Sequence, residues 1–163
     1  MRQTKRLVSL TAVLLIAACT DNSIFNPMTN AAGTYQLTVY AGKTIPATYQ
    51  IQPGDPNYPQ YPSGATFVVT GGTLVLQSNG SFTETNNYQT TGNGGGTTTP
   101  SQFVSTGTWT LNGTTFSLFA PAQNGNAARN VSGTLDTDAN GVLTVNYQEP
   151  NQTGGFDSFE YKQ

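Results

Sequence analysis

A short Gly-Thr motif recurs along this chain, each time at the start of a run in which apolar and polar residues alternate. The motif begins at Gly33, Gly72, Gly107 and Gly133. The last three runs lead into Asn-Gly pairs at 79–80, 112–113 and 140–141. Asn-Gly between alternating runs is the strongest short signal for a β-hairpin, because both residues tolerate the positive φ of a type I′ turn. The pattern therefore predicts a series of antiparallel hairpins.

The alternation divides the chain into ten expected strands and no helix beyond the N-terminal leader. We expect them at roughly 33–40, 44–51, 65–70, 72–78, 81–90, 102–111, 114–119, 130–136, 142–148 and 156–162. The break at Gly71-Gly72 has a second interpretation, a bulge within one long strand. Two longer loops are expected, a proline-rich one at 52–64 and a glycine-rich, mobile one at 91–101.

Each expected strand has one apolar face and one face rich in threonine. The apolar positions are Tyr35, Leu37, Val39, Leu74, Leu76, Trp109, Leu111, Leu143, Val145 and Tyr147. An antiparallel sheet of this kind must bury its apolar face by closing into a barrel or by packing against a second sheet. Consecutive hairpins favour an all-β, antiparallel up-and-down barrel of about 8–10 strands. A β-sandwich is the alternative.

The first residues have the organisation of an export signal. Positive charges at Arg2, Lys5 and Arg6 precede an apolar stretch at 7–16, which is too short for a membrane span of roughly 20 residues. The ending Leu-Ile-Ala-Ala before Cys19 resembles the lipobox of bacterial lipoproteins. That resemblance implies a lipid on the thiol, cleavage before Cys19 and acylation of the new amine, commonly with palmitate. An ordinary signal peptide that leaves a free thiol is the alternative.

These features predict a signal peptide at 1–18, a flexible tether at 19–32 and a barrel domain at 33–163. The membrane is the expected partner, through the N-terminal lipid. Thr20 lacks the acidic side chain that often marks retention in the inner membrane, so the lipobox resemblance favours the outer membrane, facing the periplasm or the surface. We expect a protein of the cell envelope.

Composition excludes several kinds of function. Without residues 1–18 the chain keeps three basic residues against eight acidic ones, a net charge of −5. Nucleic acid is therefore not an expected partner. The chain has no histidine and one cysteine, which removes histidine-based nucleophilic catalysis and histidine-rich metal sites. We expect neither enzymatic activity nor a cofactor.

The order of the motifs resembles small bacterial lipoproteins with a lipocalin-like domain. The matching segments are Gly-Thr-Tyr at 33–35, Gly-Thr-Leu-Val-Leu at 72–76, Gly-Thr-Trp-Thr-Leu-Asn-Gly at 107–113 and Phe-Glu-Tyr-Lys at 159–162. The resemblance implies a calycin-type barrel, in some members with an internal cavity for a small apolar or amphipathic ligand. A non-catalytic module that contacts another envelope protein or a glycan, through Tyr58 and Tyr61, is the alternative.

Three residues are candidates for ligand contact: Glu84, Trp109 and Tyr147. Glu84 shares a face with Phe82, so it either points into the barrel, where it could meet Lys43 or Arg129, or is turned to solvent by a bulge. Asp136, Asp138 and Asn140 match the opening of a calcium loop. The same residues suit a plain turn, which is the interpretation we favour.

Overall fold

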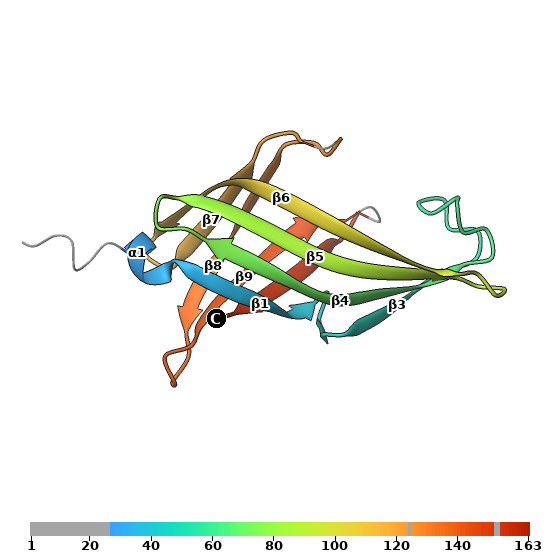
Figure 1. Ribbon diagram of the computed structural model, residues 1–163, viewed down its shortest axis with the longest axis horizontal. Coiled ribbons are helices and arrows are strands. Elements are labelled where there is room, and N and C mark those ends of the chain that lie inside the picture. Colours follow the sequence, from blue (N-terminus) through green and yellow to red (C-terminus); the bar gives the residue numbers. More distant parts are fainter. Residues whose placement is uncertain (1–26, 124, 152–153) are drawn as a thin grey trace, which may run out of the picture.

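The computed structural model describes residues 27–123, 125–151 and 154–163, which form one short helix and ten strands (Figure 1). The elements are α1 (Pro27–Ala31), β1 (Gly33–Tyr40), β2 (Lys43–Thr44), β3 (Ala47–Ile51), β4 (Ala65–Leu76), β5 (Ser81–Gly92), β6 (Thr98–Asn112), β7 (Thr115–Ala120), β8 (Arg129–Thr137), β9 (Leu143–Pro150) and β10 (Phe156–Lys162).

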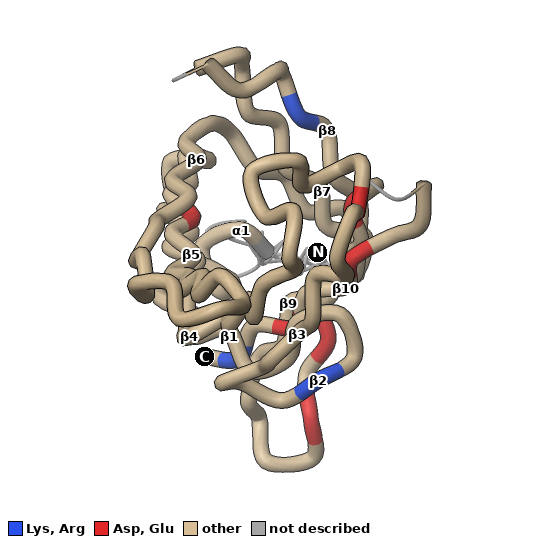
Figure 2. Tube along the Cα trace, turned by 90° about the vertical axis from the view of Figure 1, so that its right-hand side faces the viewer, with Lys and Arg blue, Asp and Glu red and all other residues tan. Residues whose placement is uncertain are grey.

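Eight of these strands close into an antiparallel barrel. Neighbours in sequence pair from β4 to β10, β10 pairs with β1, and β1 pairs with β4 to complete the ring. The closing register places Tyr35 opposite Leu74. The expected up-and-down barrel is thus confirmed, and the open β-sandwich is not what forms. Seen along its axis, the barrel is a ring of strands with α1 behind it (Figure 2).

The break at Gly71-Gly72 is a bulge within one strand, the second of the two interpretations given above. The register of β4 against β5 shifts between Val69 and Gly71. Side chains alternate with a period of two along a strand, so one inserted residue exchanges the two faces. The bulge lets Val69 and Leu74 both point inward, and both are fully buried.

Two expected boundaries were wrong. The strand expected at 44–51 is divided at Pro46, which has no N–H to donate to a ladder, so that β2 pairs with β1 while β3 pairs with β4. The loop expected at 91–101 is shorter, because β5 runs to Gly92 and β6 starts at Thr98. Pairing between β5 and β6 extends the hairpin beyond the apolar alternation that marked it in the sequence.

The half of the barrel next to α1, called the near half here, has an apolar interior. Large side chains from several strands meet there in one continuous core. Those exposed by at most 2% are Tyr35, Leu74, Leu76, Phe82, Trp109, Phe116 and Leu118. Trp109 packs against Phe116, with ring centroids 6.2 Å apart, and its indole N–H donates to the carbonyl of Gln77 at 2.9 Å.

The end of the predicted tether is folded rather than free. Within the described residues, the segment predicted as a flexible tether at 19–32 contributes α1. Ala31 is buried, and its carbonyl accepts a hydrogen bond from the Tyr35 hydroxyl at 2.6 Å. This contact fixes α1 at the near end of the barrel (Figure 1). Among the described residues, no helix has the length and apolar character needed to span a membrane.

β8 and β9 approach closely at one glycine. A Cβ atom on Gly133 would lie 1.9 Å from the carbonyl oxygen of Asn146 and 2.7 Å from the Cβ of Tyr147. Only a residue without a side chain fits there. Gly133, which begins the last of the four Gly-Thr motifs, is therefore needed for the close packing of β8 against β9.

Candidate functional site

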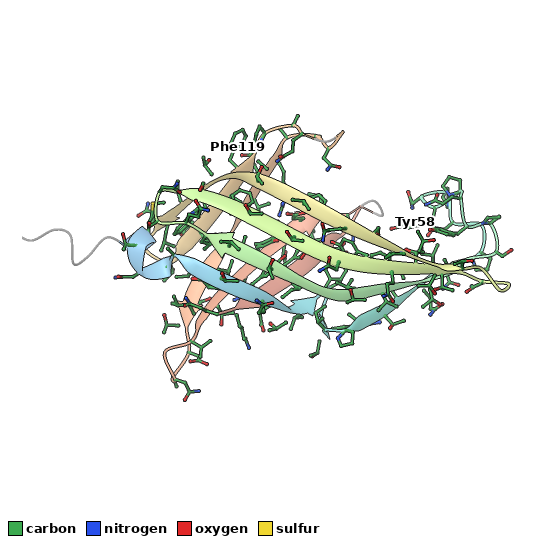
Figure 3. All side chains as sticks on the ribbon, in the orientation of Figure 1. Tyr58 and Phe119 are labelled. Atoms are coloured by element: carbon green, nitrogen blue, oxygen red, sulfur yellow. The ribbon has the colours of Figure 1, made fainter. Side chains whose placement is uncertain are left out.

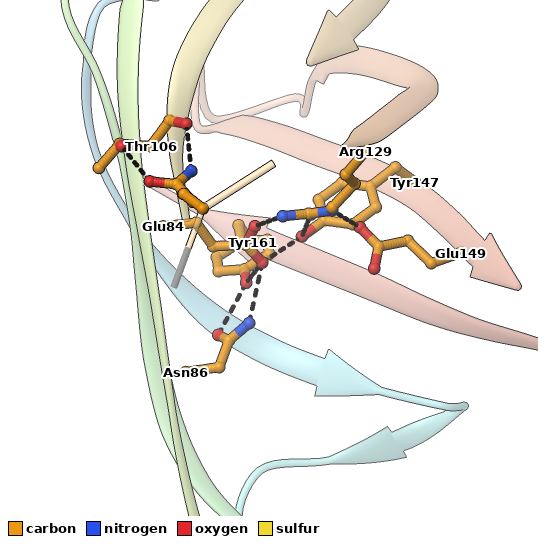
Figure 4. A network of polar contacts seen from close by, with 8 residues as sticks. Glu84, Asn86, Thr106, Arg129, Tyr147, Glu149 and Tyr161 are labelled. Carbon is orange, nitrogen blue, oxygen red and sulfur yellow. Dashed lines mark hydrogen bonds and ion pairs between the residues drawn. The ribbon is translucent and has the colours of Figure 1, made fainter. Parts of the chain in front are cut away.

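The half of the barrel away from α1, called the far half, contains polar side chains that meet in the interior. We call this group the buried network; its members are Glu84 and Asn86 on β5, Arg129 on β8, Tyr147 and Glu149 on β9, and Tyr161 on β10 (Figure 4). They converge because β5 alternates strictly at this point, with Phe82, Glu84 and Asn86 all buried. The inward position considered for Glu84 is the one observed.

Every oxygen of the Glu84 carboxylate has a protein partner. Oε1 accepts hydrogen bonds from the hydroxyls of Tyr147 at 2.5 Å and Tyr161 at 2.7 Å, and from Nδ2 of Asn86 at 2.8 Å. Oε2 lies 2.6 Å from Nη1 of Arg129. A buried charge is tolerated when it is paired and hydrogen-bonded in this way. Glu84 is therefore held in place by the fold alone.

Arg129 links the two carboxylates of the network. Its Nε is ion-paired with Glu149, and the guanidinium lies over the ring of Phe103, 5.6 Å from the centroid. Burial works against the charged form, but Glu84, Tyr147 and Glu149 outweigh it and raise the pKa of Arg129 above its ordinary value. Of the two partners considered for Glu84, Lys43 and Arg129, the fold supplies Arg129.

Three members of the network, Tyr147, Tyr161 and Glu149, have raised pKa values, which favour their neutral forms. Burial raises the pKa of Tyr147 and of Tyr161 well above the ordinary value for tyrosine, and the charge of Glu84 raises both further. Burial also raises the pKa of Glu149, against the opposing effect of Arg129. The tyrosines act as hydrogen-bond donors to a carboxylate, and all of these groups are occupied with one another.

A small side cavity borders the network. It lies beside the part of β6 that continues past the end of β7 and does not pair with it. Gln123 lines this cavity and is held beside β6, because its amide donates to the carbonyl of Thr106 at 2.7 Å and its Oε1 accepts from the Thr106 hydroxyl at 2.9 Å. The cavity measures about 150 Å³, and Phe103, Arg129 and Glu149 are among its lining residues.

A second cavity lies at the far mouth of the barrel. We call it the mouth cup; it measures about 210 Å³ and is lined by Tyr40, Ala41, Tyr49, Gln50, Ile51, Asp55, Tyr58, Phe67, Asn151 and Asp157. Its lining residues come from β1, β3, β4 and β10, from the loop 52–64, and from the positions directly after β1 and β9, Ala41 and Asn151. Figure 3 shows Tyr58 at this end, away from α1.

Aromatic rings form the wall of the mouth cup. Tyr40 meets Tyr49 edge to face, with centroids 5.6 Å apart, and Phe67 lies next to Tyr49 at 6.5 Å. Below them Tyr40 contacts Phe159 at 5.1 Å and Phe67 stacks on Tyr88 at 5.3 Å. The rings continue into the barrel interior, so the cup has a rigid aromatic floor.

Two carboxylates face this aromatic wall. Asp157 accepts hydrogen bonds from the Tyr40 hydroxyl at 2.6 Å and from Nδ2 of Asn151 at 3.0 Å. Burial raises the pKa of Tyr58, and the charges of Asp157 and Asp55 raise it further. The same two causes, burial and then Asp157, raise the pKa of Tyr40 far above its ordinary value. Asp55 and Asp157 line the cup, and among the described residues no basic one does, which gives its wall a negative charge.

The candidate calcium loop forms a turn in the structure. Oδ1 of Asp138 accepts hydrogen bonds from the backbone N–H groups of Asn140 at 2.8 Å and Val142 at 2.9 Å, and these bonds lower its pKa. Asp136 instead accepts from the Thr134 hydroxyl at 2.7 Å. In the described parts of the chain, no three His, Cys, Asp or Glu residues are grouped in a way that could hold a metal ion.

The three ligand candidates do not lie at one place. Glu84 and Tyr147 are hydrogen-bonded to each other in the buried network, whereas Trp109 belongs to the apolar core of the near half. Cys19 lies outside the described residues. The sequence drew attention to Tyr58 only as part of a loop, and it did not indicate the other rings of the cup or Asp157. The hydrogen bond between Asp157 and Tyr40 joins residues 117 positions apart, which no local pattern reveals.

Searches of protein-family models, of curated proteins and of solved structures gave no match for this chain.

Proposed function

We propose that this chain is a lipid-anchored lipoprotein of the cell envelope, in the outer membrane, whose barrel binds a small amphipathic ligand at the mouth cup. The mouth cup carries the proposal: it combines aromatic rings with carboxylate and amide groups around about 210 Å³. Ligand sites are concave and largely apolar, with a few polar groups that fix orientation. A cavity of about 150 Å³ is enough for benzene, so the cup has room for a substituted aromatic ring.

The cup suits a ligand better than the interior does. The near half is filled by its apolar core, in which Trp109 and Phe116 are almost fully buried. In the far half, the Glu84 carboxylate already has four protein partners. A ligand bound deep in the barrel would have to displace these contacts, whereas the cup offers ring faces at the surface of the molecule.

The position of the anchor agrees with this arrangement. Eight positions separate Cys19 from Pro27, the first residue of α1, and an extended chain spans at most ~3.6 Å per residue, or about 29 Å. The proposed lipid on Cys19 is thus tied to the near end of the barrel. The mouth cup, at the opposite end, would face away from the membrane and be open to ligands in the surrounding compartment.

A non-catalytic interaction module is the second candidate function. Phe119 and Phe156 are 46% and 64% exposed, which is unusual for large apolar side chains. An envelope protein or a glycan that covers one of them would account for their exposure. Binding of a small molecule at the cup, as tested below, separates this candidate from the first.

Two experiments test the proposal. Cells that express the full chain are labelled with radioactive palmitate; we expect label in the protein, and none in the Cys19→Ser variant. For the cup, the full chain is placed in phosphatidylcholine nanodiscs and titrated with 2-phenylethanol by saturation-transfer NMR, with empty nanodiscs as blank. Tyr58→Ala should weaken the signal, since Tyr58 lines the cup.

The same loop supplies a matched control for the second experiment. Tyr61 is close to Gly92 on β5 and does not line the cup, so Tyr61→Ala should leave probe binding unchanged. Equal loss of binding in both variants would overturn the assignment of the cup as the ligand site, and so would a failure of the unaltered chain to bind 2-phenylethanol and its ammonium and carboxylate analogues.

A further inference from the structure

We infer that the mouth cup selects organic cations, such as a primary or quaternary ammonium on a small apolar body. The inference rests on the proposed function, because it names the class of ligand that the cup would take. It is drawn from three observations: the ring faces that surround the cavity, the charge of its wall, and an ammonium of the chain itself that already lies on one of the rings.

The rings provide the first part of the argument. Tyr40, Tyr49, Tyr58 and Phe67 border a single cavity of about 210 Å³. The face of an aromatic ring is negative, so a cation within ~6 Å of the ring centroid is attracted to it, the more strongly as it is removed from water. Because four aromatic residues line this one cavity, an ammonium inside it would lie close to more than one ring.

The charge of the wall provides the second part. Asp55 and Asp157 both line the cup, and each keeps an acceptor site beyond its protein hydrogen bonds, since a carboxylate has about four lone-pair sites. The described residues contain three basic side chains (Figure 2). Arg129 is paired with Glu84 and Lys162 with Glu160, so neither neutralises the cup.

Lys43, the remaining basic side chain, shows how a cation meets this wall. Its Nζ lies 4.3 Å from the centroid of the Tyr49 ring and donates to the carbonyl of Thr48 at 2.7 Å. Lys43 does not line the cavity. With its charge included, two carboxylates still face one ammonium, so the cup favours a further cation and disfavours an anion.

The cup is formed before a ligand arrives. The loop that carries Asp55 and Tyr58 is closed by its own backbone hydrogen bonds, among them Gly54 to Pro62 at 3.1 Å and Tyr58 to Asp55 at 3.0 Å. Asp157 is fixed by the Tyr40 hydroxyl and by Asn151. A ligand therefore meets rings and carboxylates that are already in place, which reduces the entropy lost on binding.

Three probes of similar size and different charge test this selectivity: 2-phenylethylammonium, 2-phenylethanol and phenylacetate. The full chain in phosphatidylcholine nanodiscs is titrated with each by calorimetry and saturation-transfer NMR. We expect the ammonium to bind about tenfold more tightly than the alcohol and phenylacetate to bind most weakly. Raising the salt concentration should weaken binding of the ammonium and leave the alcohol unchanged.

Variants of the two carboxylates locate the effect. Asp157→Asn keeps an acceptor for the Tyr40 hydroxyl. It should weaken binding of 2-phenylethylammonium about fivefold and change binding of 2-phenylethanol by less than about twofold. Asp55→Asn gives the same test at a half-buried position in the loop 52–64, so that no strand residue is changed. Asp136→Asn is the matched control, because it removes one negative charge at the near end, and it should alter neither probe by more than about twofold.

The outcomes distinguish the two proposals. If 2-phenylethanol binds as tightly as the ammonium, or if both cup variants leave the ammonium unchanged, selection for cations is wrong while ligand binding at the cup stands. If none of the three probes binds to the unaltered chain, the cup is not a ligand site and both proposals fail.

Discussion

The near and far halves of this barrel are made from the same eight strands but have different interiors. The near half is closed by α1 and filled with apolar side chains around Trp109. The far half holds a carboxylate that is fully buried, a paired arginine and a cavity with acidic residues in its wall. Burial of apolar side chains in the near half favours folding, whereas the far half carries buried charged groups, which are tolerated because they are paired.

More of the buried tyrosines lie in the far half than in the near half. Their raised pKa values predict the largest effect, complete unfolding in alkali. Burial raises the pKa of Tyr35 in the near half to about 12, and it raises those of Tyr88, Tyr147 and Tyr161 in the far half further. A pKa raised by folding means that the neutral form is the folded one. The stability it contributes is full below pH ~10 and is lost as the pH rises through the folded-state pKa.

We therefore expect the melting temperature to fall steeply above pH ~10, and the buried tyrosines to ionise together with unfolding. Absorbance at 295 nm and far-UV circular dichroism, recorded in the same titration, check this. If all the tyrosines ionise near pH 10 while the circular dichroism stays native, the interior of the far half is open to water and the comparison between the halves fails.

Trp109→Ala tests the near half by itself. Removing a buried tryptophan leaves a cavity and removes the indole hydrogen bond to the Gln77 carbonyl, so we expect a loss of about 3–5 kcal/mol in the free energy of unfolding. Phe119→Ala is the control, because Phe119 is 46% exposed and its truncation should cost less than about 1 kcal/mol. Urea unfolding measures both. Similar losses in the two variants would mean that Trp109 is not part of a packed core.

Glu84→Gln tests the buried network. The variant keeps the size of the side chain but removes the charge that Arg129 faces at 2.6 Å. Breaking a buried ion pair costs about 3–5 kcal/mol, and because Glu149 still pairs with Arg129, we expect about 3 kcal/mol, the lower end of that range. Unfolding in urea at pH 7 gives the value.

The matched control is Glu160→Gln. Glu160 also pairs with a basic residue, Lys162 at 3.1 Å, but these side chains are 29% and 47% exposed, and ion pairs in contact with water contribute about 0–1 kcal/mol. Should the two variants lose the same free energy, the network would be no more than another surface ion pair.

Much of the fold follows from local patterns in the sequence, and much of the site does not. Alternation and Asn-Gly turns are local, so they locate the strands, and they place Glu84 on the face of Phe82. The partners of Glu84 depend on which strands meet when the ring closes. Arg129 and Tyr161 are 45 and 77 positions further along the chain, and no periodicity within β5 refers to them.

Register adds a second limit to what the sequence can tell. The bulge between Val69 and Gly71 exchanges the faces of β4, and a strict alternation continued through it would turn Leu74 outward. The Gly-Gly pair indicates a bulge or a break without deciding between them. The cup is harder still to foresee, because Tyr40 and Asp157 come from opposite ends of the domain and meet only in the closed barrel.

The smallest expected effects concern the cup, where two tyrosine hydroxyls can be compared. The Tyr40 hydroxyl donates to Asp157 at 2.6 Å, whereas Tyr58 is half-buried in the loop at the mouth. Tyr40→Phe removes a hydrogen bond to a charged group and should lower the free energy of unfolding by about 1.5–3 kcal/mol, at the lower end because the site is partly hydrated. Tyr58→Phe should change it by less than about 0.5 kcal/mol. Urea unfolding of both variants, with cation binding measured on the same samples, checks this comparison. A cup that serves to bind a ligand should contain groups, such as the Tyr58 hydroxyl, that contribute little to stability. A large loss of stability in Tyr58→Phe would instead mean that the mouth is a structural extension of the core.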